Sequence, residues 1–217
     1  MDRDIKQKEG LLIVISGPSG AGKGTVCRSY LKRNPDTILS VSVTTRQPRR
    51  GEKEGVNYFF RDKSTFESMI ENDEFLEYAM VYDNYYGTPK EYVFKHLNRG
   101  KDVILEIDIQ GALQVKKNFE KGVFIFIMPP SMKELKRRIV SRGTETPEVI
   151  MKRFKSAYDE INFIDQYNYI VVNDRVDKAV KKIEAIVMAE KCKVDRNRDF
   201  YINIREGGCL NDRSTTK

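Results

Sequence analysis

The chain has 217 residues, enough to bury one sizeable core, and this length favours a single α/β domain with insertions. With 40% hydrophobic and 33% charged residues, the composition excludes disorder along the whole chain. No apolar run reaches the roughly 18 to 20 residues of a membrane-spanning helix, and the charged first ten residues do not resemble a signal peptide. We therefore expect a cytoplasmic protein without membrane partners. Its three widely spaced cysteines argue against a disulfide framework or a zinc site.

The formal net charge of +7 fits three kinds of partner: a nucleic acid, a membrane surface or a small phosphate-bearing ligand. The polar tail from residue 191 onward holds seven basic and four acidic residues, so nearly half of the excess lies there. Residues 196–217 of this tail have little periodicity, which predicts weak order, and the tail offers only Phe200 and Tyr201 for stacking on bases. Its mixed charges and few aromatic residues argue against a nucleic acid partner.

Four short apolar runs have the length of strands, and their residues are continuous rather than alternating. Such runs are typical of strands buried on both faces of a parallel sheet. A segment with helical spacing follows each run, so strands and helices alternate as in βαβ units. The sequence therefore predicts an α/β fold in which helices cover a parallel sheet core, with strands at residues 11–15, 103–107, 123–128 and 169–172.

Three pairs of residues have the spacing of a capping box, in which a Ser or Thr and a Glu three positions later cap a helix N-terminus. The pairs begin at Ser64, Thr88 and Ser131, while Pro89 and Pro147 suit the first position of a helix. The stretch between residues 40 and 87 breaks the alternation of strands and helices, which predicts an insertion.

A glycine-rich segment directly follows the first predicted strand and directly precedes a helical pattern. Its glycines let backbone N–H groups point at phosphate oxygens, the helix N-terminus adds positive potential, and Lys23 can reach the β- and γ-phosphates. A plain turn needs no such lysine, and the order of the glycines excludes a Rossmann fingerprint. The segment predicts a nucleoside triphosphate site formed by Gly17, Pro18, Ser19, Gly20, Ala21, Gly22, Lys23, Gly24 and Thr25.

One position departs from the general pattern Gly-x-x-x-x-Gly-Lys-[Ser/Thr], because Gly24 follows the lysine and the hydroxyl lies one residue later, on Thr25. The usual hydroxyl ligand of Mg²⁺ is thus missing from its place. We expect Mg²⁺ as the cofactor, held mainly by nucleotide phosphates and water, with Thr25 and Asp108 as candidate protein ligands.

The insertion contains a second group of candidate phosphate ligands. Arg46 and Arg49 flank Pro48, which fixes the local backbone. Guanidinium groups bind phosphate through two parallel hydrogen bonds, so the two arginines can clamp one phosphate monoester together.

Further motifs follow in order along the chain. Besides the glycine-rich loop, they are TTRQPRRGE at 44–52, Glu77, NYYGT at 84–88, DIQG at 108–111, PPS at 129–131, RGTET at 142–146 and VND at 172–174. With these motifs the chain, from about residue 11 to residue 190, resembles the guanylate kinases, which are P-loop nucleoside monophosphate kinases. The resemblance implies a P-loop kinase fold with a GMP-binding insertion and a small lid. It also implies transfer of the γ-phosphoryl group of ATP to GMP, giving ADP and GDP in purine metabolism.

The resemblance assigns the GMP phosphate and the guanine to separate groups of residues. Chemistry agrees for the base, because guanine presents two parallel donors, N1–H and the 2-amino group, which one carboxylate can accept, whereas adenine has an acceptor at N1. Leaving such a carboxylate unpaired beside adenine discriminates by roughly 10⁴ or more. The implied phosphate ligands are Arg46, Arg49, Tyr58 and Tyr86, and the implied base ligands are Ser42, Glu77 and Thr88, with Asp108 as a further GMP contact.

On the ATP side, Arg138, Arg142 and Arg153 resemble the lid arginines of the family, which close over the triphosphate. Arg138 and Arg142 are four residues apart and share a helix face; without the resemblance, a solvated basic face would be the favoured interpretation. Asn173 matches the region that lines the ATP base, although an ordinary helix N-cap is the alternative. Glu106, on the same strand face as Asp108, is a weaker second candidate for ordering Mg²⁺-bound water.

The resemblance also implies a layout. It consists of a polar extension at 1–10, a guanylate kinase-like domain at 11–190 and a polar basic tail at 191–217. Within the domain, the core spans 11–37 and 89–190, the GMP-binding insertion covers about 38–88, and the lid covers about 138–153.

The phosphate acceptor is already an anion, so no strong general base is required, and we expect the only histidine, His96, to be structural. Catalysis is then positioning and charge neutralisation by Lys23, Arg46 and the lid arginines. Two rival functions remain: a catalytically inactive guanylate kinase-like module that binds phosphopeptides, and a kinase for another nucleoside monophosphate. The intact Lys23 argues against the first and Glu77 against the second. The patterns favour neither a monomer nor a homo-oligomer.

Overall fold

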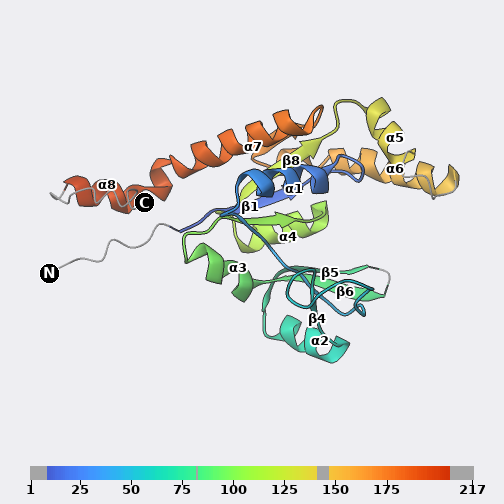
Figure 1. Ribbon diagram of the computed structural model, residues 1–217, viewed down its shortest axis with the longest axis horizontal. Helices are drawn as coiled ribbons and strands as arrows, with labels where there is room; N and C mark the ends of the chain where they lie inside the picture. Colours follow the sequence, from blue (N-terminus) through green and yellow to red (C-terminus); the bar gives the residue numbers. More distant parts are fainter. Residues whose placement is uncertain (1–8, 82, 141–146, 206–217) are drawn as a thin grey trace.

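The computed structural model describes residues 9–81, 83–140 and 147–205, and its centre is a five-stranded parallel sheet (Figure 1). The strand order is β2-β7-β1-β8-β9, so β1 is central, and Ile13 pairs with both Ile104 and Val123. The four strands predicted from apolar runs are confirmed to within one residue at each end. The strands are β1 (Leu12–Ser16), β2 (Ile38–Leu39), β7 (Val103–Glu106), β8 (Val123–Met128) and β9 (Tyr169–Val172).

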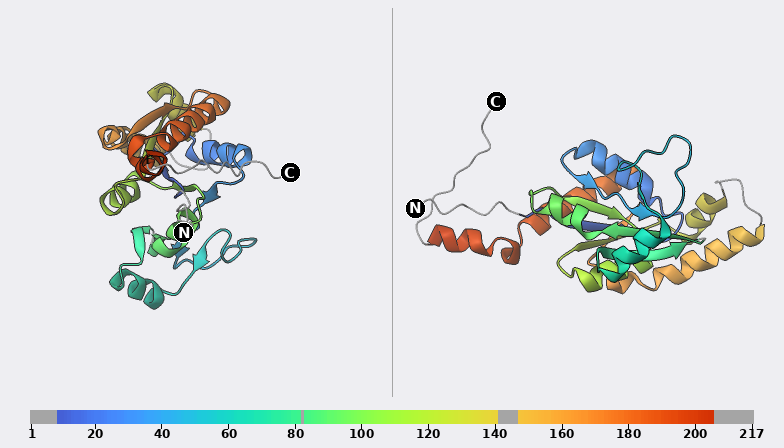
Figure 2. Two further views of the ribbon diagram at one scale, coloured as in Figure 1. Left: turned by 90° about the vertical axis from the view of Figure 1, so that its left-hand side faces the viewer. Right: turned by 90° about the horizontal axis from the view of Figure 1, so that it is seen from below.

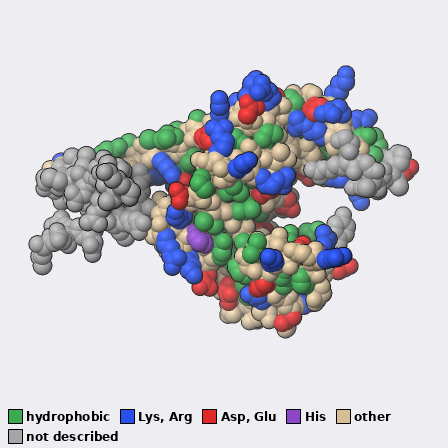
Figure 3. All heavy atoms as spheres, viewed as in Figure 1, with side chains coloured by type: hydrophobic (Ala, Val, Ile, Leu, Met, Phe, Trp, Pro, Cys, Tyr) green, Lys and Arg blue, Asp and Glu red, His purple; other side chains and the backbone are tan. Residues whose placement is uncertain are grey.

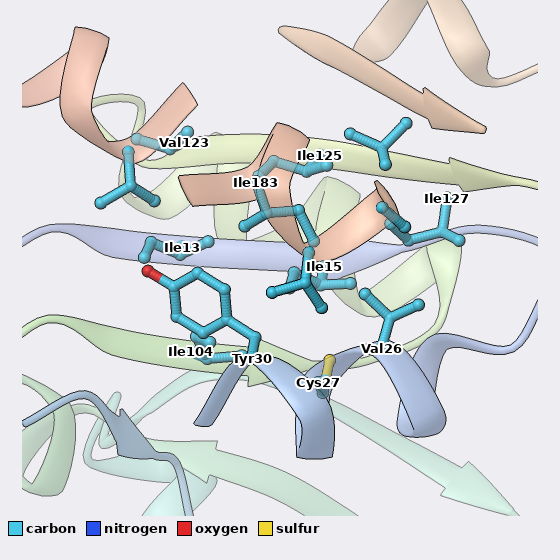
Figure 4. Packing of buried hydrophobic residues seen from close by; sticks show 14 of the residues in the cluster. Ile13, Ile15, Val26, Cys27, Tyr30, Ile104, Val123, Ile125, Ile127 and Ile183 are labelled. Carbon is cyan, nitrogen blue, oxygen red and sulfur yellow. The ribbon is translucent and has the colours of Figure 1, made fainter. Parts of the chain in front are cut away.

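The apolar run of β1 is buried on both faces of the sheet. On one face, Ile13 and Ile15 pack against α1 (Lys23–Arg33) and α7 (Val176–Lys191), where Tyr30 and Ile183 meet them (Figure 4). On the other face, the side chains of β1 pack against α3 (Lys90–Leu97) and α4 (Ile109–Asn118). This two-sided burial explains why the strand sequence is continuously apolar.

Two further helices lie at the end of the core where β1 terminates (Figure 1). They are α5 (Met132–Val140) and α6 (Pro147–Ile161), and a short 3-10 helix, η1 (Ile164–Gln166), connects α6 to β9. Leu135 and Ile139 of α5 pack against Ala157 and Phe154 of α6 in a small apolar cluster of their own. The two helices therefore form a unit next to the carboxyl ends of the core strands.

The predicted insertion folds into a second sheet that stands apart from the core in the left view of Figure 2. Its order is β4-β3-β6-β5, and its small core stacks Phe66 against Phe75 at 4.4 Å and Tyr85 at 5.0 Å between ring centroids. The first residues of the stretch predicted as insertion form β2, which belongs to the core sheet. The elements are β3 (Val43–Thr44), β4 (Phe59–Phe60), α2 (Lys63–Glu71), β5 (Phe75–Val81) and β6 (Asn84–Pro89).

Helix α4 joins the two sheets. The side-chain amide of Gln114 exchanges hydrogen bonds of 3.2 and 3.1 Å with the backbone of Tyr78, and Nδ2 of Asn118 donates to the carbonyl oxygen of Leu76 at 2.8 Å. Since Tyr78 and Leu76 belong to β5, these contacts fix β5 relative to the core.

The structure corrects two of the three predicted helix starts. Ser131 is confirmed, because its hydroxyl accepts a hydrogen bond from the N–H of Glu134 at 3.1 Å. The N-cap of α2 is Asp62, which accepts from the N–H of Thr65 at 2.7 Å, so Ser64 lies inside the helix. Thr88 lies in β6, because its pairing with β5 takes precedence over a cap. Asp62 and Ser64 lie two residues apart and both suit an N-cap, so the local sequence does not decide between them and tertiary contacts do.

The predicted weak order of the tail from residue 196 is wrong for residues 196–205. A 3-10 helix, η2 (Val194–Arg196), and an α-helix, α8 (Arg198–Arg205), follow α7. The buried carboxylate of Glu190 accepts from the Tyr169 hydroxyl at 2.5 Å and pairs with Lys193 at 2.6 Å and Arg196 at 3.2 Å, which anchors η2. None of the helices in the described ranges combines the length and hydropathy that a bilayer crossing requires.

Candidate active site

The glycine-rich loop connects the carboxyl end of β1 to the N-terminus of α1, and its shape depends on glycine. Gly17, Gly20 and Gly22 have φ values of 138°, 89° and 90°. A Cβ at Gly17 would lie 2.3 Å from the carbonyl oxygen of Ile127, and one at Gly22 would lie 2.6 Å from Nδ2 of Asn173. Both the backbone conformation and the surrounding space therefore require glycine here.

Lys23 begins α1, and its side chain folds back onto the loop. Its Nζ donates to the carbonyl oxygen of Gly17 at 2.5 Å. Burial lowers the pKa of Lys23, while the nearby carboxylates of Glu160, Glu106 and Asp108 oppose this change. The loop thus holds a largely buried ammonium group that attracts anions.

Arginines from α5 and α6 contact the same loop. Arg138 donates from Nη2 to the carbonyl oxygen of Asn173 at 3.0 Å and from Nη1 to that of Ala21 at 3.3 Å. Arg153 donates from Nη2 to the hydroxyl oxygen of Ser19 at 2.9 Å. Two of the three predicted lid arginines therefore lie against the loop already.

The second sheet carries a cluster of cationic and phenolic groups. Nη2 of Arg46 donates to both carboxylate oxygens of Glu52, at 2.9 and 3.0 Å, and this hydrogen bond holds the pKa of Glu52 below its ordinary value. Glu52 also accepts from the backbone N–H of Arg49 at 2.8 Å. The guanidinium of Arg46 lies 5.4 Å from the ring centroid of Tyr58, which meets Tyr86 edge-on at 5.9 Å. Glu52 thereby fixes the side chain of Arg46 and the backbone of Arg49, and the clamp by both guanidinium groups stays a prediction.

Glu77 is a buried carboxylate in β5, with 8% of its surface exposed. The hydroxyl of Thr88 donates to its Oε1 at 2.6 Å. Burial raises the pKa of Glu77 to about 6, and the neighbouring Asp108 contributes to this rise. A Cβ at Gly111 of α4 would lie 3.1 Å from Oε2 of Glu77, so the absence of a side chain there leaves room for the carboxylate.

Two further predicted residues border this carboxylate. Ser42 directly precedes Val43, which pairs with Gly87, the neighbour of Thr88 in β6. Asp108 caps α4 by accepting from the N–H of Gly111 at 2.8 Å. A Cβ at Gly111 would lie 3.4 Å from Oδ1 of Asp108 and 3.1 Å from Oε2 of Glu77, so the two carboxylates are neighbours. Asp108 also follows β7, which pairs with β1 ahead of the glycine-rich loop, so it lies at the same end of the core sheet as that loop.

The side chain of Glu106 lies beside Gly24, the position at which the general pattern has a Ser or Thr hydroxyl. A Cβ at Gly24 would lie 3.0 Å from Oε1 of Glu106 and 3.4 Å from Nη1 of Arg28. Burial raises the pKa of the neighbouring Cys27, and the charge of Glu106 adds to this effect. A carboxylate therefore occupies the place that a Ser or Thr side chain would take after the lysine.

A pocket of about 450 Å³ opens between the start of α4 and α6. In the space-filling view, a hollow separates the core from the second sheet on the side where α5 and α6 lie (Figure 3). The pocket is lined by Asp108, Ile109, Gln110, Lys152, Lys155, Ser156, Asp159, Glu160 and Phe163.

The predicted site residues form two clusters joined by Asp108. Arg142 lies outside the described residues, so its place in the site stays a prediction. Asn173 is 3% exposed and donates from Nδ2 to the carbonyl oxygen of Ala21 at 2.8 Å, which braces the glycine-rich loop. The alternative of a helix N-cap at Asn173 is wrong, because Arg175 holds that position in α7.

Two carboxylates that contact this site, Glu52 and Glu160, were not predicted from the sequence. Glu52 lies inside the TTRQPRRGE motif at 44–52, but only the fold shows that its partner is Arg46. Glu160 accepts from the backbone N–H of Ser19 at 3.2 Å. Its spacing of seven residues from Arg153, two helical turns, was the available signal that both face the same side of α6.

Comparison with known proteins assigns the family. The guanylate kinase family model matches residues 9–190. The chain is 64% identical over 200 residues to the guanylate kinase of Caldanaerobacter subterraneus subsp. tengcongensis, covering 92% of this chain and 97% of that one. It is 62% identical over 200 residues to that of Clostridium tetani, covering 92% and 96%. The crystal structure of guanylate kinase from Anaplasma phagocytophilum matches with a TM-score of 0.71 and 35% identity, covering 92% of this chain and 96% of that one. The chain therefore belongs to the guanylate kinase family, and it is an ATP:GMP phosphotransferase with a P-loop kinase fold.

Proposed function

We propose that the two residue clusters divide this reaction between them, the glycine-rich loop taking ATP and the second sheet taking GMP. The γ-phosphoryl group of ATP passes to a phosphate oxygen of GMP, giving ADP and GDP. The position of Asp108 carries the proposal. It lies next to Glu77 at Gly111, and it follows β7, whose neighbour β1 leads into the glycine-rich loop, so the loop and the proposed base-reading carboxylate lie at the same end of the core sheet.

On the GMP side, Glu77 reads the base. Its carboxylate accepts the two parallel donors of guanine, N1–H and the 2-amino group. Thr88 orients the carboxylate from one side by donating its only hydroxyl hydrogen. The hydroxyl of Ser42 remains to donate to O6 or N7, which are both acceptors. Adenine has no 2-amino group and an acceptor at N1, so it leaves this buried carboxylate unpaired.

The phosphate of GMP binds to the Arg46 cluster. Arg46 and Arg49 supply charge-assisted hydrogen bonds, and the hydroxyls of Tyr58 and Tyr86 complete the set. Glu52 holds Arg46 through two hydrogen bonds and Arg49 through its backbone. The guanidinium of Arg46 is thus held in place before the ligand arrives, which reduces the entropy lost on binding.

On the ATP side, the backbone N–H groups of residues 17–25, Lys23 and the lid arginines hold the phosphates. Arg138 and Arg153 reach the loop in the structure, and we assign Arg142 to the same role. These cations disperse the charge on the transferred group, and closing α5 and α6 over it excludes water. Because the acceptor is an anion, no side chain has to remove a proton.

We propose Mg²⁺ as the cofactor, and the residues present fit it. The Gly24 position leaves room for the Glu106 carboxylate, a hard oxygen ligand that suits Mg²⁺ or its bound water. Glu106 and Asp108, with the hydroxyl of Thr25 as a further candidate, would hold the hydrated ion. When bound, Mg²⁺ neutralises charge on the phosphate oxygens of ATP. The cytoplasmic location expected from the sequence stays a prediction.

A coupled assay of ADP release across AMP, CMP, GMP and UMP tests the proposal. We expect release that depends on GMP, and rates for the other three nucleotides lower by about 10³ or more. Equal rates for GMP and AMP would contradict the base-reading role of Glu77, and no release with any nucleotide would support the binding module instead.

A further inference from the structure

The carboxylate of Glu160 lies against the glycine-rich loop, where a phosphate is expected. Its Oε2 accepts from the backbone N–H of Ser19 at 3.2 Å. The hydroxyl of Ser156, one turn earlier on α6, donates to its Oε1 at 3.2 Å. Both oxygens are therefore engaged, and the carboxylate is held in this position by its own helix.

The loop attracts an anion whether or not a nucleotide is present. Its backbone N–H groups, the N-terminus of α1 and the buried Lys23 all contribute positive potential. Among the charges that counteract the lowering of the Lys23 pKa by burial, Glu160 contributes most. Without nucleotide, the Glu160 carboxylate thus neutralises part of the positive charge that the phosphates of ATP would neutralise.

We propose that Glu160 is a placeholder for an ATP phosphate, a carboxylate that occupies the loop until the nucleotide displaces it. This proposal rests on the assignment of the loop to ATP. A phosphate and a carboxylate cannot share the N–H of Ser19 without strong repulsion at this distance. Binding of the triphosphate therefore breaks the hydrogen bond between Glu160 and Ser19, and Glu160 lowers the affinity of the loop for all polyphosphates.

The displacement also connects ATP binding to the position of α6. Arg153, Ser156 and Glu160 follow one face of this helix, and Arg153 donates to the hydroxyl oxygen of Ser19 at 2.9 Å. A phosphate on the loop repels Glu160 and attracts Arg153. These opposite forces act on two residues of the same helix, seven positions apart. ATP binding therefore turns α6 so that Arg153, rather than Glu160, faces the glycine-rich loop.

The variant Glu160→Gln tests the placeholder. Glutamine keeps the size of the side chain and an acceptor for Ser19 but removes the charge. Isothermal titration with inorganic tripolyphosphate, and separately with ATP in the absence of Mg²⁺, measures the affinity of the loop without turnover. We expect both to bind about tenfold more tightly than to the wild type at low salt, with a smaller gain at high salt and with unchanged GMP affinity.

Two further variants separate this effect from others. Asp159→Asn removes a charge from the same pocket at an exposed neighbouring residue, and it should change tripolyphosphate affinity by less than about twofold. Glu160→Ala should show the same gain as Glu160→Gln, because the charge is lost in both. A merely structural role for Glu160 predicts weaker binding and a lower melting temperature, which is the opposite result.

Unchanged or weaker binding of tripolyphosphate by both Glu160 variants would overturn the proposal. So would a loss of affinity confined to Mg²⁺-loaded ATP, since that result would assign Glu160 to the metal. The assignment of the loop to ATP is tested separately, because it fails only if the wild type binds no tripolyphosphate and no ATP.

Discussion

The hydroxyl of Thr88 donates a hydrogen bond of 2.6 Å to the buried carboxylate of Glu77, its direct partner across the β5–β6 hairpin. The hairpin register therefore builds the base-reading pair before any ligand binds. One carboxylate oxygen is held by Thr88, and the other faces the gap left by Gly111. If Glu77 reads the base as proposed, the specificity for guanine depends on strand pairing in the second sheet.

Replacing Glu77 with Gln should erode the preference for GMP over AMP. Glutamine keeps the shape but presents a donor where guanine also has donors, so the ratio of kcat/KM values for GMP and AMP should fall by about 10² or more. Steady-state kinetics with both nucleotides measure this ratio. The control is Glu74→Gln, at an exposed residue just before β5, and an unchanged ratio in Glu77→Gln would assign the base to another group.

The raised pKa of Glu77 predicts a specific dependence of stability on pH. The folded chain holds the proton to about pH 6, whereas an unfolded glutamate releases it near 4.3. The free energy of unfolding therefore falls as the pH rises from the pKa of the unfolded state to that of the folded state, by about 2 kcal/mol in total. Urea unfolding at about pH 4 and about pH 7 measures the free energy of unfolding of the wild type and of Glu77→Gln. This free energy should fall between the two pH values in the wild type but not in the variant, and an equal change in both proteins would contradict the prediction.

The same titration should appear in GMP binding. Guanine needs the ionised carboxylate, so GMP affinity should fall as the pH drops below about 6, while ATP affinity follows a different profile. Titration calorimetry across this range measures both. Identical profiles for the two nucleotides would show that the pH effect does not arise at Glu77.

Arg46→Ala should weaken the binding of GMP much more than the binding of ATP. The change removes the guanidinium that Glu52 orients and leaves that carboxylate near the phosphate, so we expect GMP affinity to fall by about 10². Arg50→Ala, at an exposed neighbour in the same segment, is the matched control. A larger loss for ATP than for GMP would reverse the assignment of the two clusters.

Glu106→Gln should raise the Mg²⁺ concentration needed for half-maximal activity by about tenfold, because a carboxylate ligand beside Gly24 becomes a neutral amide. Titrating Mg²⁺ against the binding of ATP, in addition to turnover, separates metal affinity from catalysis. Glu120→Gln, remote on an exposed turn, is the control. An unchanged Mg²⁺ requirement would leave the ion to the phosphates and water alone.

The core strands and the glycine-rich loop were predictable because their signals are local. A continuous apolar run such as residues 123–128 becomes a buried strand wherever helices follow it, and the glycines at 17, 20 and 22 encode the loop by their conformations. The base-reading and phosphate-binding residues came from a family resemblance, and the fold brings Glu77 and Thr88 together as that resemblance implies.

The partners of Glu52 and Glu160 were not predictable in the same way, because both contacts depend on tertiary structure. Glu160 meets Ser19 across 141 positions of the chain, where no periodicity applies. The helix cap at Asp62 was missed because Ser64, two residues later, offers an equivalent local signal. The short helix α8 was missed because its eight residues hold too little periodicity to stand out within a charged tail.

Transfer of a labelled γ-phosphoryl group from ATP to GMP in a single turnover, compared between the wild type and Lys23→Ala, tests phosphoryl transfer at the glycine-rich loop directly. We expect labelled GDP from the wild type, and from the variant a rate lower by about 10³ or more with GMP affinity within about twofold. Equal rates in the two proteins, or no labelled GDP from the wild type, would contradict this prediction.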